Sequence, residues 1–553
     1  MDMQSQLDPL PDDLPFRIIS KTVGRGAYAS IKKAIPPDRS SPVFAVKFIH
    51  KAYAVRHGRV SAKQIAMEVS LHSHIGQHPS IIEYFATGED NVWRWIAMEF
   101  AEGGDLFDKI EADVGVSEDI AHFYFTQLVS GVGYMHSKGV GHRDIKPENI
   151  LLSSTGDLKL ADFGLATLFS YKGVRKQSST MCGSPPYIAP EVIACGAKGT
   201  QTKGSRHGGD YAADQVDIWS CGVVLFVLLV GNTPWDEPSS TSWEFDQYAR
   251  SNGRTADELW QKPPHAVLSL LRGMMRIDPA TRFTFKDVRR HPWFTRANPY
   301  LSADGKIASP ISLATSMLES LKIDFTQEPK ASQPTEPESM DVDGEEAPGM
   351  KLASTQPEFP NNDMELDWER PVRATTHERW SASQPTGQPS APHALTSGPT
   401  SSWDQKFSDD PSMSQFTAAP SVPLSLTQHA QRFQDIVPSH SLTRFISHLP
   451  HSLLLPLLSE ALHRLGVRAP AFSSAALGGH DAAVWLKVKT LDGRRCPLAG
   501  DIAVEKTGIE GRQAGEELLE VRFAKIKGDP LEWRRFFKNV VVLCKEGVYV
   551  PDE

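Results

Sequence analysis

The stretch from His142 to Gly164 reads HRDIKPENILLSSTGDLKLADFG, and it decides the fold of the chain. It sets a carboxylate at Asp144, an ammonium at Lys146, an amide at Asn149 and a second carboxylate at Asp162. Carboxylate and amide oxygens are the ligands that hard divalent cations prefer. A carboxylate near a hydroxyl can also serve as a base. The spacing therefore predicts a centre in which a metal site lies beside a base.

Two upstream motifs are suited to holding phosphates. The segment TVGRGAYASI, residues 22 to 31, predicts a glycine-rich hairpin whose backbone can lie close to a ligand. Ala29 stands where a third glycine would complete this pattern, and its methyl group fits if its φ is negative. The apolar run that begins at Phe44 ends in Lys47, and Glu68 in a later amphipathic stretch is its expected partner. In isolation, Lys47 and Glu68 could equally form a solvated surface pair.

Together these motifs resemble the eukaryotic protein kinases, and the resemblance covers residues 16 to 296. It implies an α+β, bilobal protein kinase fold that uses ATP and magnesium. The implied catalytic residues are Asp144, Lys146 and Asn149, and the implied metal ligands are Asn149 and Asp162. The residues implied to bind ATP are Val23, Gly24, Gly26, Ile31, Ala45, Lys47, Glu68, Met98, Glu99, Ala101 and Asp162, with Met98 as the gatekeeper before the hinge.

The same resemblance indicates which hydroxyl is the acceptor. Lys146, two residues after the base, is typical of serine/threonine kinases. Asp105 and Glu148 are expected to receive an arginine three residues before the target, through charge-assisted hydrogen bonds. The alternative is that both are solvated acids at the rim of a cleft.

Further downstream, the sequence predicts the frame of a large lobe. Glu191 in the Ala-Pro-Glu motif is expected to pair with Arg282. Val223 to Val230 are apolar all round, which predicts a buried central helix because the run is too short to span a bilayer. Arg143 could accept a phosphate from the activation segment, but we expect activity without phosphorylation there. The insert from Cys195 to Asp210 is expected to be a surface loop.

Composition limits the class of protein. The chain of 553 residues has room for two to four domains and carries a net charge of −9. Residues 324 to 370 hold thirteen acids against three bases, a local net of −10, so the remainder sums to +1. No basic run indicates direct nucleic-acid binding. Five cysteines without paired spacing, and no signal peptide or transmembrane segment, predict a soluble intracellular protein.

Residues 297 to 436 are rich in Pro, Ser, Thr, Gln and acids, which predicts a disordered acidic linker. Between Thr326 and Gln428, six of the eight glutamines follow Ser or Thr, where composition alone gives about two such pairs. These dipeptides are expected to be regulatory phosphorylation sites, unless they are only a low-complexity tract. The sites are Thr326, Ser332, Thr355, Ser383, Ser414 and Thr427.

Residues 437 to 553 are expected to form a small α+β domain. Apolar spacing predicts helices around Leu442 to Ile446, Leu453 to Leu465 and Leu531 to Phe537. Alternation predicts strands over Val484 to Val488 and Leu518 to Lys525. A candidate basic face comprises Arg522, Lys525, Lys527, Arg534, Arg535 and Lys538, which could dock on the acidic substrate region of the kinase domain.

Three motifs sharpen the resemblance to the checkpoint kinase 1 family of fungal type: Gly103 to Asp108, Met181 to Tyr187 and Pro234 to Pro238. Thr443-Arg444-Phe445 and Val521-Arg522-Phe523 resemble that family's kinase-associated C-terminal domain. The resemblance implies a monomer, in the nucleus and also the cytoplasm, that delays the cell cycle in the DNA-damage checkpoint. Its implied partners are protein substrates (cell-cycle regulators such as phosphatases) and an upstream phosphatidylinositol-kinase-like checkpoint kinase. Tail autoinhibition, released by linker phosphorylation, is the expected regulation. The alternatives are a metabolic or polarity kinase with a similar tail, or a non-catalytic kinase-like scaffold.

Overall fold

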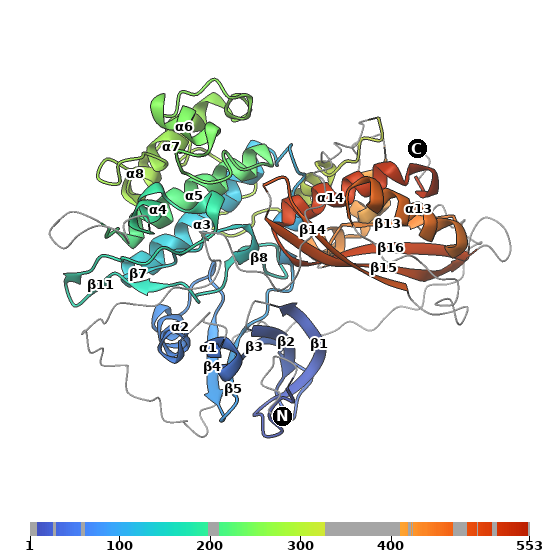
Figure 1. Cartoon of the computed structure of the whole chain (residues 1–553), viewed down its shortest axis with the longest axis horizontal. Coiled ribbons are helices and arrows are strands. Elements are labelled where there is room, and N and C mark those ends of the chain that lie inside the picture. The colour runs from blue at the N-terminus through green and yellow to red at the C-terminus, as the bar shows by residue number, and fades with distance from the viewer. Residues whose placement is uncertain are drawn as a thin grey trace, which may run out of the picture.

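The computed structural model places two lobes and a C-terminal domain in one body (Figure 1). It describes residues 8–25, 29–56, 61–196, 209–326, 407, 410–417, 422, 424–438, 440–467, 484–494, 496–510 and 517–550. Gly26 and the insert residues 197–208 therefore lie outside the described residues, as do Ser332, Thr355 and Ser383.

The small lobe is a five-stranded antiparallel sheet in the order β1-β2-β3-β5-β4. The strands are β1 (Arg17–Arg25), β2 (Ala29–Ile35), β3 (Phe44–His50), β4 (Tyr84–Glu89) and β5 (Trp93–Glu99). Helices α1 (Lys51–Arg56) and α2 (Ala62–Ile75) follow β3. The Ser61 side chain accepts a hydrogen bond from the Gln64 N–H, and this capping box fixes where α2 begins. The sheet and α2 thus set the positions of the cofactor-side residues.

The large lobe is mainly helical. Its helices are α3 (Glu118–Ser137), α4 (Pro190–Gly196), α5 (Ala213–Val230), α6 (Trp243–Arg250), α7 (His265–Met274) and α8 (Phe285–Arg290). Short strands β6 (Gly104–Asp105), β8 (Ile150–Leu152) and β9 (Leu158–Leu160) form a sheet beside them, and β7 (Val140–Gly141) pairs with β10 (Thr167–Leu168). Strands β11 (Ser170–Tyr171) and β12 (Val174–Arg175) form a hairpin. The α+β class and the two-lobed arrangement expected from the sequence are confirmed.

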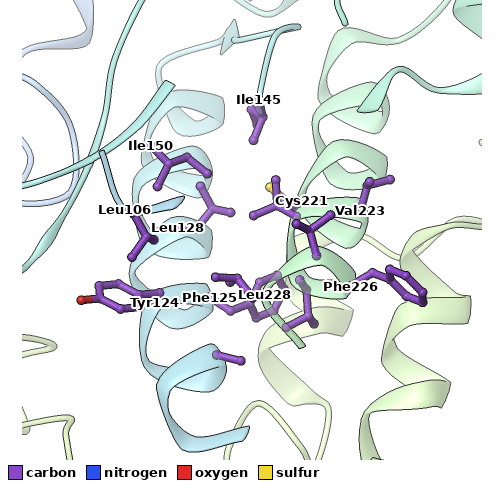
Figure 2. Packing of buried hydrophobic residues seen from close by; sticks show 14 of the residues in the cluster. Leu106, Tyr124, Phe125, Leu128, Ile145, Ile150, Cys221, Val223, Phe226 and Leu228 are labelled. Atoms are coloured by element: carbon purple, nitrogen blue, oxygen red, sulfur yellow. The ribbon is translucent and has the colours of Figure 1, made fainter. Parts of the chain in front are cut away.

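The core of the large lobe lies between α3 and α5. Figure 2 shows Phe125 and Leu128 of α3 facing Cys221 and Leu228 of α5, all within one buried cluster. Helix α5 is long and apolar enough to cross a membrane, but 89% of that window is buried inside the protein, as the sequence analysis expected of a central helix. It ends at Gly231, whose left-handed φ of 70° lets its N–H bond to the Val227 carbonyl oxygen.

The expectation of disorder throughout residues 297–436 is wrong at both ends of this range. Helix α9 (Pro310–Glu319) buries Leu313 and Met317 in the large-lobe core, and the Tyr124 hydroxyl bonds to the Met317 sulfur at 3.3 Å. Nearer the tail lie η5 (Pro411–Phe416), α11 (Leu424–His429) and α12 (Phe433–Ile436). These elements are short, and composition averaged over the polar segment around them hid their few apolar residues.

The C-terminal domain is an antiparallel sheet in the order β13-β16-β15-β14, covered by helices with a core of its own. Its elements are β13 (Arg444–Ser447), α13 (His451–Arg464), β14 (Val484–Leu491), β15 (Pro497–Glu510), β16 (Glu517–Lys527), α14 (Pro530–Leu543) and η7 (Lys545–Gly547). The strands and helices predicted around Val484, Leu518, Leu453 and Leu531 are confirmed. The helix predicted from Leu442 to Ile446 is wrong. Arg444 to Ile446 instead belong to β13, where Phe445 pairs with Val521 at the sheet edge and both side chains are buried.

The C-terminal domain lies beside the large lobe (Figure 1). Helix α14 packs against the short 3₁₀ helix η1 (Phe107–Lys109), which follows the hinge. The Arg534 guanidinium lies 2.8 Å from Glu111, and both side chains are almost fully buried. The Lys109 ammonium donates to the His440 carbonyl oxygen at 2.7 Å. The tail is therefore joined to the kinase lobes by buried polar contacts, just after the hinge.

Candidate active site

Lys47 is the centre of a buried charge cluster between the lobes. Its ammonium lies 2.5 Å from Glu68 of α2 and 2.9 Å from Asp162. The predicted pairing of Lys47 with Glu68 is therefore confirmed, and a solvated surface pair is excluded because both side chains are about nine-tenths buried. Burial raises the pKa of Glu68, and Lys47 offsets only part of this rise. Burial also disfavours the Asp162 carboxylate, but the Lys47 ammonium outweighs this effect and holds the pKa of Asp162 well below its usual range.

The side chains expected around a nucleotide base converge from β1, β2, β3 and β5. Ile31 pairs with Lys47 across β2 and β3, and Ala45 pairs with Met98 across β3 and β5. Gly24 lies in β1 against Ile31, and Val23 beside it is 47% exposed. Ala29 is buried in the extended backbone of β2, which is compatible with its methyl group.

The hinge follows β5. The N–H of Glu99 donates to the Glu83 carbonyl oxygen at 2.8 Å, and the Glu99 carboxylate lies 2.6 Å from Lys159. These contacts direct the Glu99 side chain toward the large lobe and use its N–H inside the protein. The Glu99 backbone carbonyl oxygen therefore remains as the group that can contact a nucleotide base. Ala101, two residues on, is 8% exposed.

Asp144, Lys146 and Ser184 form a compact triangle in the catalytic loop. The Lys146 ammonium lies 2.9 Å from Asp144 and donates to the Ser184 hydroxyl at 2.8 Å. The Ser184 hydroxyl in turn donates to Asp144 at 3.1 Å. Burial opposes the charge on Lys146, but Asp144 and Glu148 outweigh this and raise the pKa of Lys146. The ammonium is therefore charged at neutral pH, next to a carboxylate in position to act as a base.

Asn149 is held by the same loop. Its amide nitrogen donates to the Asp144 carbonyl oxygen at 2.8 Å. This fixes the orientation of the side chain and leaves the amide oxygen as a possible metal ligand. Among the described residues no group of three or more His, Cys, Asp and Glu side chains could hold a metal ion. Asn149 and the half-exposed Asp162 therefore fit a cation that takes few protein ligands and completes its shell with phosphate oxygens and water, as magnesium does.

Phe163 links the two lobes behind the cleft. Its ring lies 4.4 Å from the His72 ring of α2 and 5.5 Å from the His142 ring of the catalytic loop. Burial lowers the pKa of His72 to about 4, so this imidazole is neutral at physiological pH and packs as an aromatic ring. These tilted ring contacts hold Phe163, the residue after Asp162, between α2 and the catalytic loop.

Asp105 and Glu148, the expected receptors for a substrate arginine, do lie together, but a tail residue already reaches them. The Lys525 ammonium of β16 lies 3.4 Å from Asp105. Burial and the neighbouring Asp108 raise the pKa of Asp105 to about 7, although Lys525 opposes the rise. Within the part of the chain that the structure describes, Glu148 Oε2 is buried and lacks a hydrogen-bond partner. The pair is thus an acidic pocket, not a solvated rim.

The described Ser/Thr-Gln dipeptides are not all alike. Thr326 is exposed, whereas Ser414 is half-buried in η5. The next residue, Gln415, is buried: its amide donates to the Leu442 carbonyl oxygen at 2.9 Å and accepts from Arg534 at 3.1 Å. Thr427 is half-buried in α11. The prediction that Thr326, Ser414 and Thr427 all lie in one disordered segment is therefore wrong.

The predicted basic face is also divided. Lys525, Arg535 and Lys538 face the kinase lobes, whereas Arg522 pairs with Glu505 inside the tail domain at 3.2 Å. Lys527 is exposed and Arg534 is fully buried. Sequence reasoning missed the acids that receive these cations, Glu111 and Asp113, although both follow the acidic Asp105 region closely. It also missed the contacts of Ser184, whose place in the Cys-Gly-Ser-Pro motif was the available signal.

The lobes, the Lys47 cluster and the Asp144 triangle define a protein kinase. The family model described as "Protein kinase domain" matches residues 18–294. The chain is 38% identical to "Serine/threonine-protein kinase chk1" of Schizosaccharomyces pombe, over 98% of each chain. It is 35% identical to "Serine/threonine-protein kinase CHK1" of Saccharomyces cerevisiae over 99% of each, and 30% identical to its namesake in Mycosarcoma maydis over 96% of each. The chain therefore belongs to the Chk1 family of serine/threonine-protein kinases, enzymes that use ATP and a divalent metal to phosphorylate proteins.

Proposed function

We propose that Asp144 orients the acceptor hydroxyl and takes its proton, with Lys146 and Ser184 fixing the carboxylate. The triangle of contacts among these three side chains carries the proposal. Lys47 and the residues around β1 to β5 would hold ATP, and Asn149 and Asp162 would hold magnesium. When bound, the metal neutralises charge on the phosphates. The chain's own residues align the acceptor hydroxyl with the phosphate that it attacks.

Purified full-length chain should transfer phosphate from ATP to a serine peptide, and Asp144→Ala should not. Because Asp144 lies in the catalytic loop and is not part of the apolar core, the variant should unfold at nearly the same temperature. Transfer by Asp144→Ala at the rate of the unchanged chain would exclude this residue as the base.

We further propose that the enzyme acts in the DNA-damage and replication checkpoint, in the nucleus and also the cytoplasm, and delays the cell cycle by phosphorylating regulators such as phosphatases. The relatives carry the checkpoint kinase name over the full length, tail included. The excess of Ser/Thr-Gln dipeptides supports an upstream phosphatidylinositol-kinase-like kinase. Damage-dependent phosphorylation of these sites in cells, found by mass spectrometry, would support the role. Unchanged occupancy would favour a metabolic or polarity kinase instead.

The position of the tail supports autoinhibition. Lys525 of β16 lies in the pocket of Asp105 and Glu148, where a substrate arginine would have to bind. Two further pairs hold α14 on the segment after the hinge: Arg535 with Asp113 at 2.7 Å, and Lys538 with Glu111 at 2.8 Å. A docked tail and an arginine-bearing substrate would therefore compete for the same carboxylates. We propose that the tail holds the unmodified enzyme at low activity in this way.

Lys525 is an imperfect substitute for the arginine. A lysine has one compact ammonium, whereas a guanidinium can bridge two carboxylates with its planar fork. The unpartnered Glu148 Oε2 is the oxygen that such a fork could satisfy. A substrate could therefore displace the tail once docking is weakened, for example when phosphates on the acidic linker add about −2 charges each and compete for the cations of α14.

The test uses the full chain. Lys525→Glu or Arg535→Glu should raise basal kcat/KM severalfold, because each variant replaces an ion pair across the interface with a repulsion. Lys487→Glu is the matched control, since Lys487 is exposed on β14 of the same domain. If all three variants match the unchanged chain in activity and in thermal midpoint, tail autoinhibition is excluded while kinase activity itself is untouched.

A further inference from the structure

Arg143 of the catalytic loop is a buried cation whose guanidinium donates its described hydrogen bonds to uncharged oxygens, whereas its backbone N–H donates to Asp217 at 2.7 Å. Arg143 is 3% exposed. The guanidinium donates to the Leu165 carbonyl oxygen at 2.8 Å and to the Tyr211 hydroxyl at 3.2 Å. In kinases switched on by phosphorylation, an arginine at this place pairs with a phosphate of the activation segment, which orders that segment. In this chain the corresponding position next to Arg143 is taken by a tyrosine side chain.

Tyr211 is bound to the activation segment through both its backbone and its hydroxyl. The Ser178 N–H donates to the Tyr211 carbonyl oxygen at 2.9 Å, and the Tyr211 N–H donates to Ser178 at 2.7 Å, which makes an antiparallel bridge. The Tyr211 hydroxyl donates to the Thr180 carbonyl oxygen at 2.5 Å. The side chain is 3% exposed, so solvent does not compete for these bonds.

The hydroxyl has enough bonding capacity for this role. A phenol has one proton to donate and two lone pairs to accept with. The proton goes to Thr180, one lone pair meets Arg143, and Cys182 Sγ lies 3.6 Å from the same oxygen. Burial raises the pKa of Tyr211, so the phenol keeps its proton at physiological pH. Every bond is thus compatible with a neutral tyrosine.

The segment that Tyr211 holds leads directly into the active site. Ser184, four residues after Thr180, contacts both Asp144 and Lys146. Between them, Gly183 has a φ of 108° and packs so closely that an added Cβ would lie 3.0 Å from the Arg143 carbonyl oxygen. A shift of residues 178–182 would therefore move Ser184 relative to the base.

We propose that Tyr211 is a positioning residue for phosphoryl transfer: its hydroxyl takes the place of an activation-segment phosphate at Arg143 and holds residues 178–184 against the catalytic loop. Tyr211 lies at the N-terminal edge of α5, which is anchored in the core of the large lobe. The segment is thus tied to a rigid element instead of to a modification. The inference rests on the kinase activity of the family and not on tail autoinhibition.

The experiment compares two Tyr→Phe variants in the full-length chain, after phosphatase treatment verified by intact mass. Tyr211→Phe removes only the hydroxyl that bonds Arg143 and Thr180. Tyr248→Phe is the matched control, because it removes another buried large-lobe hydroxyl, which donates to the Met275 carbonyl oxygen at 3.1 Å. We expect kcat to fall about three- to tenfold in Tyr211→Phe, with KM for ATP nearly unchanged, and to stay within about twofold in Tyr248→Phe.

Two further readouts separate positioning from general loss of stability. Amide hydrogen exchange at residues 178–184 should accelerate in Tyr211→Phe but not in Tyr248→Phe. Arg143→Lys should lower kcat, and the losses of Arg143→Lys and Tyr211→Phe should not multiply in the double variant, because both single changes break the shared Arg143–Tyr211 bond. Equal kcat in Tyr211→Phe and Tyr248→Phe, or losses that multiply in the double variant, would overturn the proposal. If Tyr211→Phe is too unstable to assay, unchanged kcat in Arg143→Lys would also overturn it.

Discussion

Three charged side chains within the cleft, Lys47, Asp144 and Asp162, do different work although they lie close together. Asp144→Ala and Asp162→Ala should each abolish turnover, because the first removes the proposed base and the second a proposed metal ligand. Lys47→Arg should be severely defective, since the 2.5 Å contact with Glu68 leaves no room for a planar guanidinium. Steady-state kinetics with thermal midpoints as the folding control would test all three. Near-normal turnover in any folded variant would remove that residue from the proposed site.

A second prediction at the residue scale concerns the acidic pocket. With a peptide carrying arginine three residues before the serine, Asp105→Asn and Glu148→Gln should lower kcat/KM by about 1–3 kcal/mol for the lost charge-assisted contact. With alanine at that position the same variants should change little. Comparing both peptides on the unchanged and the variant enzyme separates loss of the arginine contact from release of Lys525, because release of Lys525 would affect both peptides. A peptide profile indifferent to this arginine, in the unchanged enzyme, would contradict the assignment.

Some side-chain contacts could be predicted from the sequence and others could not. The pairing of Arg282 with Glu191, at 2.6 Å and 2.9 Å, could be predicted because both partners lie in motifs at characteristic places. The bond of Tyr211 to Arg143 could not, since it joins residues 68 apart and Tyr211 follows an insert of no recognised pattern. Arg534 was misjudged as a surface charge because a sequence does not show that Glu111 would be buried opposite it.

Helices and strands likewise divide into those that the sequence predicted and those that it did not. Long periodic segments such as α13 and β16 were predicted from spacing alone, but β13 has only four residues, too few to distinguish a strand from a helix by periodicity. Helices α9 and α12 were hidden for a related reason. Each buries a few apolar residues on the large lobe, and the acidic, proline-rich chain between them dominates any average over the region.

Helix α12 provides the prediction at this scale. Phe433 is buried against Gly156, in the turn between β8 and β9, so α12 fastens the segment before the C-terminal domain to the large lobe. Phe433→Ala should destabilise this attachment by about 3–5 kcal/mol and raise basal activity by loosening the tail. Phe433→Leu keeps most of the apolar contact. Its attachment stability and basal activity should therefore lie between those of Phe433→Ala and those of the unchanged chain. Hydrogen exchange over residues 424–442, measured with activity, checks both effects. Faster exchange without any rise in activity would show that α12 does not contribute to tail docking.

At the scale of the whole molecule, kinase lobes, linker ends and tail meet at one buried polar junction. Arg534 of α14 contacts Glu111 at 2.8 Å and Gln415 at 3.1 Å, and Gln415 bonds to the backbone around β13. Ile323, just after α9, donates its N–H to the Gln415 carbonyl oxygen. Both ends of the linker are thus tied in at the place where the tail rests on the lobes. A buried junction of this kind is sensitive to the loss of any one member, because an unpaired charge would remain.

The junction predicts an order in which the proposed Ser/Thr-Gln sites are modified. Ser414 is half-buried in η5 and the glutamine that an upstream kinase would have to recognise is 1% exposed, so Ser414 should be a poor substrate while the tail is docked. We predict that Arg535→Glu, which weakens docking, accelerates phosphorylation of Ser414 by a Ser-Gln-directed kinase, whereas Lys487→Glu does not. Ser332 serves as the internal reference in each sample, and site occupancies followed by mass spectrometry give the ratio of rates. A ratio that is the same in all three chains would show that docking does not protect Ser414. A raised ratio in Arg535→Glu alone would mean that Ser414 is modified after the tail leaves the junction.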